Sequence, residues 1–132
     1  MQRLKTRAQF QAVLAGATLA RTHHFALHHV ALAFAGDALF PVSDIWLGAM
    51  VPKRWAKRAV TRNAIKRQIY AVSAESHLLP QAHVVRLRAG FDRKQFVSAS
   101  SQALKLAVRE ELIKLFKRAE EAVSKSSVGS MA

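Results

Sequence analysis

The sequence predicts a single α+β domain, a sandwich of a small sheet and helices, and three observations lead to this fold class. The chain has 132 residues, of which 51% are hydrophobic, enough for one domain with a modest core. Apolar runs typical of strands alternate with segments of helical periodicity, in the order helix, two or three strands, helix, strand, helix. There is no internal repeat or linker, so we expect one domain over residues 1–122 and a disordered tail over residues 123–132.

The first predicted helix spans Thr6–Ala15. Thr6 and Gln9 have the spacing of a capping box, in which each side chain bonds the backbone amide of the other residue. Apolar residues follow at helical spacing, namely Phe10, Val13 and Leu14. Gly16 is a plausible end for this helix.

Three segments are predicted as strands. The first, Thr22–Phe34, is rich in Phe and Val and has no 3.6-residue period. The second is Asp44–Val51, where the following Pro52 removes a donor from the ladder. Pro41 argues against a continuous strand between these two. The third is His83–Gly90, in which apolar residues alternate with arginines.

Two further helices complete the predicted order. In the central one, Lys57–Ser73, three apolar residues share a face, namely Ile65, Ile69 and Val72. The opposite face carries Arg62, Asn63, Lys66, Arg67 and Tyr70. Residues 92–101 are expected to form a loop or the entry to the last helix, Ser98–Ala122. That helix has an apolar stripe made by Leu104, Val108, Leu112 and Leu115.

Positive charge dominates the chain, with 21 Lys and Arg against 8 acids and a formal net charge of +13. No acid occurs between Asp44 and Glu75, although this segment contains the whole basic helix. Solvated helix faces usually mix signs, whereas Arg58, Arg62 and Lys66 repel one another at i,i+4 spacing, at about a few tenths of a kcal/mol per pair. Such a pattern favours a polyanionic partner, because bound phosphates release counterions and fit the forked donors of Arg.

The sequence also argues against several classes of protein. There is no cysteine, so disulfides and thiolate metal sites are excluded, and a reducing, cytoplasmic location is expected. No apolar run is long enough for a signal peptide or for a membrane span, which needs about 20 residues. We predict no metal site: His24 and His28, on one strand, would lie about 13 Å apart.

No catalytic centre is predicted. A two-metal nuclease needs clustered carboxylates, but the acids are scattered and half of them lie on the last helix among basic residues: Glu110, Glu111, Glu120 and Glu121. There is no Gly-rich phosphate loop and no nucleophile elbow.

The segment "LGAMVPKRWAKRAVTRNAIKRQI" resembles the signature of the bacterial ribonuclease P protein component. Gly48 in a strand, the Lys53-Arg54 pair, Arg62-Asn63 and then Ile-Lys-Arg take the places of that pattern. "RLKTRAQFQAVLAGA" is similar to the family's first helix, and the order of elements agrees over about residues 3–118. The chain departs from the pattern at Ala64 and Tyr70, where the family carries Arg, and at Leu14, where many members have an aromatic residue.

The resemblance implies a protein subunit that helps a catalytic RNA remove the 5′ leader of precursor tRNA. The RNA subunit would hold Mg²⁺ and perform the hydrolysis, so the protein alone would bind no cofactor and supply no catalytic residue. Its partners would be the ribonuclease P RNA and precursor tRNA, with one protein monomer per RNA and no membrane. The implied fold is a compact sandwich with a left-handed βαβ crossover, which handedness statistics alone would not predict.

The resemblance also implies two sets of site residues. The expected RNA-binding residues are Lys53, Arg54, Lys57, Arg58, Arg62, Asn63, Lys66 and Arg67. The expected leader-binding cleft contains Phe10, Leu14 and His28, where an aromatic ring stacks on a base at about 1–3 kcal/mol. For Phe10, packing in the core is an equally good interpretation, and for Phe25 and Phe34 it is the better one. Asn63 is equally compatible with a plain exposed position.

Other functions also account for parts of the sequence. A basic architectural or ribosome-associated RNA-binding protein would explain the charge, but not Gly48, Lys53-Arg54 and Arg62-Asn63 at this spacing. A membrane-surface helix would need Trp or Phe on the apolar face of the central helix, which has neither. A free-standing nuclease would need the missing carboxylate cluster.

Overall fold

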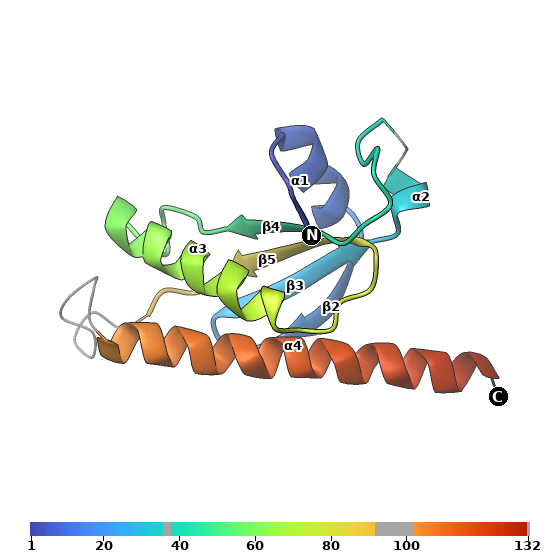
Figure 1. The fold of residues 1–132 in the computed structure, drawn as a ribbon. Helices are drawn as coiled ribbons and strands as arrows, with labels where there is room; N and C mark the ends of the chain where they lie inside the picture. The colour runs from blue at the N-terminus through green and yellow to red at the C-terminus, as the bar shows by residue number, and fades with distance from the viewer. Residues whose placement is uncertain (36–37, 92–101, 132) are drawn as a thin grey trace.

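In the computed structural model, one five-stranded sheet separates the first helix, on one face, from the two longest helices, on the other (Figure 1). The structure describes residues 1–35, 38–91 and 102–131. The strands are β1 (Gln2–Arg3), β2 (Ala17–Arg21), β3 (Phe25–Val30), β4 (Trp46–Met50) and β5 (Ala82–Leu87). The helices are α1 (Arg7–Leu14), α2 (Leu32–Ala35), α3 (Ala59–Ala74) and α4 (Gln102–Met131). This mixed architecture confirms the predicted α+β class.

The sheet has the strand order β1-β4-β5-β3-β2. The edge strand β1 pairs in parallel with β4, and β4 pairs in parallel with β5, while β3 is antiparallel to both of its neighbours. Helix α3 connects the adjacent parallel strands β4 and β5. In Figure 1 both strands point left, β5 lies below β4 and α3 crosses in front of the sheet, which is the predicted left-handed sense.

Helix α1 forms as predicted, because its first turn is capped from both sides. Thr6 Oγ1 accepts a hydrogen bond from the Gln9 amide at 3.2 Å, and Gln9 Oε1 accepts one from the Thr6 amide at 3.1 Å. The Gln9 side chain also donates to the Leu39 carbonyl at 2.9 Å, which ties the helix to the chain before β4. At Gly16, just past the helix, a Cβ would collide with the His29 carbonyl oxygen.

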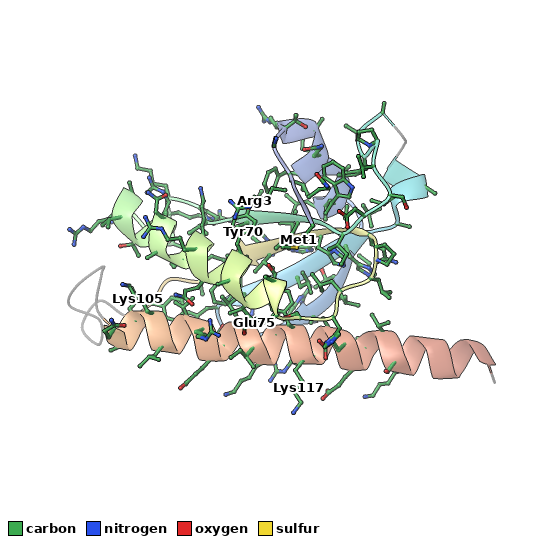
Figure 2. All side chains as sticks on the ribbon, in the orientation of Figure 1. Met1, Arg3, Tyr70, Glu75, Lys105 and Lys117 are labelled. Carbon is green, nitrogen blue, oxygen red and sulfur yellow. The ribbon has the colours of Figure 1, made fainter. Side chains whose placement is uncertain are left out.

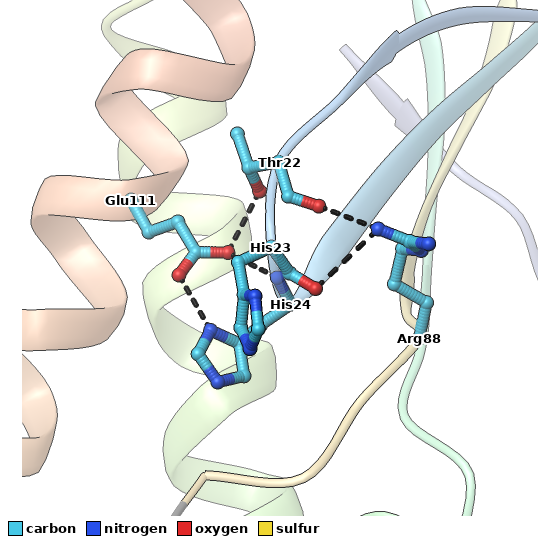
Figure 3. Close-up of polar contacts among 5 residues, drawn as sticks. All are labelled: Thr22, His23, His24, Arg88 and Glu111. Atoms are coloured by element: carbon cyan, nitrogen blue, oxygen red, sulfur yellow. Dashed lines mark hydrogen bonds and ion pairs between the residues drawn. The ribbon is translucent and has the colours of Figure 1, made fainter.

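The predicted strand Thr22–Phe34 is wrong in extent, because the chain here forms the hairpin β2–β3 followed by the short helix α2. The turn has neither Gly nor Pro, so local sequence did not reveal it. A carboxylate of α4 builds it instead: Glu111 accepts hydrogen bonds from Thr22 Oγ1 and from the His24 amide, each at 2.7 Å (Figure 3). Arg88 Nη1 closes the other side by donating to the Thr22 carbonyl at 2.9 Å.

Two hydrophobic clusters occupy the two faces of the sheet. The apolar faces predicted for α3 and α4 are buried together with Phe25, which confirms their periodicity and the core interpretation of Phe25. The smaller cluster on the α1 side contains Leu4, Val13, Phe40, Trp46, Ala82 and Val84. The side chain of Phe34 lies outside the described residues.

Helix α4 is longer than predicted. It is described from Gln102, and its expected start at Ser98 lies outside the described residues. It continues to Met131, so the predicted helix end at Ala122 is wrong, and residues 123–131 of the expected tail are helical in the structure. No glycine or proline interrupts the helix before Gly129, so nothing local terminates it at Ala122.

Gly48 is needed by the packing of α1 on the sheet. A Cβ at this position would lie 2.6 Å from Cε1 of Phe10 and 3.1 Å from Cβ of Leu4. The Phe10 ring therefore sits directly on the backbone of β4, in contact that only glycine permits. A side chain at residue 48 would displace the Phe10 ring and disturb the packing of α1 on the sheet.

The buried histidine of β5 makes stability depend on pH. Burial lowers the pKa of His83 from 6.5 to about 4, and its Nδ1 lies 3.3 Å from the Trp46 carbonyl oxygen. Between these two pKa values the unfolded chain binds a proton that the folded chain does not. We therefore expect the free energy of unfolding to fall as the pH drops from about 6.5 to 4, with His83 contributing roughly 3 kcal/mol at most.

His83→Gln removes this titration and keeps a side-chain donor for the carbonyl. Urea unfolding of both proteins between pH 7 and pH 4 should show a smaller pH dependence in the variant. Equal pH dependence in the two proteins would contradict this role of His83.

Candidate nucleic-acid interface

The basic side of α3 lies opposite its buried side, as its periodicity predicts. Ile65, Ile69 and Val72 are buried against the sheet and α4. The polar side faces away from them and toward the edge of the sheet that β1 and β4 form. Burial of one side thus fixes where the cations of the other side point.

An open basic cavity of about 470 Å³ lies beside α3 at this edge. It is lined by Arg3, Asn63, Lys66, Arg67, Tyr70 and Ala71. The structure therefore brings together three of the predicted RNA-binding residues, Asn63, Lys66 and Arg67. No acid is among the described residues that line the cavity, so its three cations have no protein counter-charge there.

The acids nearest in the sequence to this cavity are engaged elsewhere. Asp44 lies 3.4 Å from the amino group of Met1 and accepts a hydrogen bond from the Gln2 side chain. Hydrogen bonds from the Ile45 amide and then from Gln2 lower the pKa of Asp44. Glu75, at the end of α3, pairs with Arg109 of α4 at 3.1 Å. Figure 2 shows Glu75 at the end of α3 that lies near α4.

Arg62 does not line the cavity but anchors the basic turn before α3. Its Nη1 donates to the carbonyl oxygens of Ala56 and Lys57, at 3.0 and 2.8 Å. Helix α3 begins at Ala59 with Arg58 as its N-cap, two residues later than predicted. Arg62 thereby holds the turn that presents the remaining predicted RNA-binding residues, all of them exposed: Lys53, Arg54, Lys57 and Arg58.

Trp55 lies in the same turn and is 38% exposed. The guanidinium of Arg54 is 5.2 Å from the centre of its ring, within the range of a cation–π contact. Trp55 was not among the site residues predicted from the sequence. An aromatic residue between two basic pairs is the signal that could have indicated it.

The three residues of the predicted cleft all lie on the α1 side of the sheet, but they differ in how far they are exposed to solvent. Phe10 and Leu14 are partly buried and pack against the smaller cluster. His28 is buried, and its ring is bonded on both sides: Nε2 accepts from Arg86 Nε at 3.2 Å, so Nδ1 carries the hydrogen and donates to Thr18 Oγ1 at 3.3 Å. His28 is thus placed to orient Arg86, and its role in the leader-binding cleft stays a prediction.

Arg86 adds a cation on this side of the sheet. It stands two residues along β5 from Val84, which packs under α1, so both side chains point to the same face. Burial first, and then the charges of Arg88, Arg54 and Arg21, lower the pKa of Arg86. Burial, followed by the charges of Arg86 and Arg21, likewise lowers the pKa of His28. The sequence signal that could have indicated Arg86 is its position within an otherwise apolar strand.

The sequence has two histidine pairs, His23-His24 and His28-His29, and neither forms a metal site in the part of the chain that the structure describes. His24 precedes β3, stacks on Phe91 with ring centres 3.9 Å apart, and places Nδ1 2.7 Å from Glu111. Within residues 1–35, 38–91 and 102–131, no three His, Asp or Glu side chains are grouped to hold one ion.

The helices in these ranges are also too short or too polar to cross a membrane.

Comparisons with known proteins identify the family. The Ribonuclease P family matches residues 1–120. The chain is 38% identical over 118 residues to the ribonuclease P protein component of Bordetella parapertussis, covering 88% of this chain and 89% of that one. It is 36% identical over 124 residues to that of Ralstonia pickettii, covering 92% and 81%.

A solved structure shares the fold. The RNase P protein of Staphylococcus aureus aligns with a TM-score of 0.65 over 90% of this chain and 95% of its own, at 23% identity. The family match over nearly the whole length and the identity to the curated relatives establish the relationship. The chain therefore belongs to the ribonuclease P protein family, the protein components of an endoribonuclease that processes tRNA.

Proposed function

We propose that the protein binds the ribonuclease P RNA through α3 and the turn before it, and binds the 5′ leader of precursor tRNA beside α1. The observation that carries this proposal is the basic side of α3, where no acid of the described ranges lines the cavity beside Lys66 and Arg67. The RNA subunit would hold Mg²⁺ and carry out the hydrolysis, with one protein monomer per RNA. The protein's contribution is to neutralise and position phosphates.

Two features support separate sites for the two RNAs. The cavity at α3 lies on the side of the sheet edge that faces α3, whereas Phe10 and Arg86 lie on the α1 side. The first surface combines cations with Asn63, which can bond a ribose hydroxyl or a base edge. The second combines a partly buried aromatic ring with a cation, a pairing that suits single-stranded RNA of varied sequence.

Lys66→Ala is the cleaner test of the first surface, because Arg62 also holds the turn. We expect weaker binding to the ribonuclease P RNA and a salt dependence reduced by about one unit of log K against log salt, because one phosphate contact is lost. Lys117→Ala is the matched control, since Lys117 is exposed and points away from the sheet on the outer side of α4 (Figure 2). Equal effects of the two substitutions would contradict a specific role for α3.

Phe10→Leu and Phe10→Ala test the second surface. Leu keeps apolar packing on Gly48 but cannot stack, so both variants should reduce the preference of the assembled complex for precursor tRNA over mature tRNA. The expected loss is about 1–3 kcal/mol per unstacked base. The ratio of the two dissociation constants measures this preference. If Phe10→Leu retained it, Phe10 would act only through core packing.

A further inference from the structure

The cavity beside α3 is built from two segments far apart in the sequence. Arg3 comes from the short strand β1, and the other lining residues come from α3. The Arg3 guanidinium lies over the ring of Tyr70, with Cζ 3.9 Å from the ring centre. Figure 2 shows the two residues side by side between the sheet edge and α3. Arg3 was not among the predicted RNA-binding residues, and Tyr70 stands where the family pattern has Arg.

The backbone on either side of Arg3 is fixed by the sheet. The Gln2 amide donates to the Ile45 carbonyl at 2.8 Å, and the Leu4 amide donates to the Leu47 carbonyl at 2.9 Å. Leu4 is buried on the α1 side. Because side chains alternate along a strand, Arg3 must point to the α3 side.

Tyr70 is held from two directions as well. It lies one turn beyond Lys66 on α3, and its hydroxyl oxygen accepts a hydrogen bond from the Ala49 amide of β4 at 3.3 Å. The ring is therefore pinned between helix and sheet, with one face available to the guanidinium. Arg3 and Tyr70 thus meet in a defined geometry rather than through two long, freely rotating side chains.

Because its partner is an aromatic ring and not a carboxylate, Arg3 remains able to bind an anion. A carboxylate would hold the guanidinium but cancel its charge, whereas an aromatic ring holds it and leaves its full charge and its in-plane donors for another ligand. Lys66 and Arg67 line the same cavity, and no described acid does. Three cations converging without a counter-charge suit an anion that arrives from outside.

We propose that Tyr70 is a positioning residue that holds Arg3 so that Arg3, Lys66 and Arg67 bind one backbone phosphate of an RNA strand, with Asn63 on the adjoining ribose. This inference rests on the proposed function and deepens it by adding a second chain segment, β1, to the RNA-binding surface. The proposed function assigns this phosphate to the ribonuclease P RNA, and precursor tRNA offers the same chemical group. The chemistry of recognition is the same for both.

The test uses the full chain with Arg3→Ala, Tyr70→Leu, Tyr70→Phe and the double variant Arg3→Ala/Tyr70→Leu. Phe keeps the ring but loses the bond to the Ala49 amide, so it separates positioning from a purely structural role. We expect Arg3→Ala and Tyr70→Leu each to weaken RNA binding by about fivefold, from loss of the held guanidinium. The double variant should be no weaker than Arg3→Ala alone, and Tyr70→Phe should recover most of the affinity that Tyr70→Leu loses.

The salt dependence is the second readout. Arg3→Ala and Tyr70→Leu should each flatten it by about one unit of slope, whereas Tyr70→Phe should not. Affinity is measured in two arms: protein with the ribonuclease P RNA alone, and the assembled complex with precursor tRNA. The arm in which the loss appears identifies which RNA supplies the phosphate.

Two results would overturn the inference. If Tyr70→Phe lost as much affinity as Tyr70→Leu, the residue would act through the Ala49 contact and not by holding Arg3. If Arg3→Ala left affinity and salt slope unchanged in both arms while Lys66→Ala reduced them, the cavity would bind no phosphate through β1, and the proposed function would stand. Failure of Lys66→Ala as well would instead count against the proposed function itself.

Discussion

Burial of one side of α3 is the interaction on which the rest of the surface depends. Its cations repel one another at about a few tenths of a kcal/mol per i,i+4 pair. Against this, burying an Ile side chain contributes about 1.5–3 kcal/mol, and the helix buries Ile65, Ile69 and Val72. Packing therefore outweighs the repulsion by a wide margin. The helix therefore folds without needing its charge to be neutralised by other parts of the chain.

The β4-α3-β5 crossover determines which strands lie beside the basic side of α3. Helix α3 connects the adjacent parallel strands β4 and β5 and lies along the sheet edge that β1 completes. Its basic side then borders β1, which supplies Arg3, while its N-terminal turn lies near Arg86 of β5 through Arg54. The position of one helix thus places cations both at the sheet edge and near Arg86 on the α1 side. The proposed binding of two RNAs uses both surfaces.

Elements with local signals were predicted well from the sequence. The capping box of Thr6 and Gln9, the apolar side of α3 and the strands β4 and β5 each depend on residues close together in the chain. The β2–β3 turn was missed because its hydrogen-bond acceptor, Glu111, comes from α4.

Long-range pairing explains the missed site residues too. Strand β1 is two residues long and exists only through its pairing with β4, so no periodicity could place Arg3 beside Tyr70. His28 was assigned to the cleft from its position in the resemblance, and only the fold shows that its ring is bonded between Thr18 and Arg86. Residue type indicated a basic surface. The partner of each side chain depended on which strands came to be neighbours.

The most direct test of the protein's role is cleavage of precursor tRNA by a bacterial ribonuclease P RNA at low magnesium, with and without this protein. We expect 5′ maturation to be stimulated only when RNA and protein are both present, with no cleavage by the protein alone. Absence of stimulation with RNA binding intact would contradict the account and would leave an architectural RNA-binding protein. Cleavage by the protein alone would contradict it more deeply, since it would place the catalytic groups in this chain.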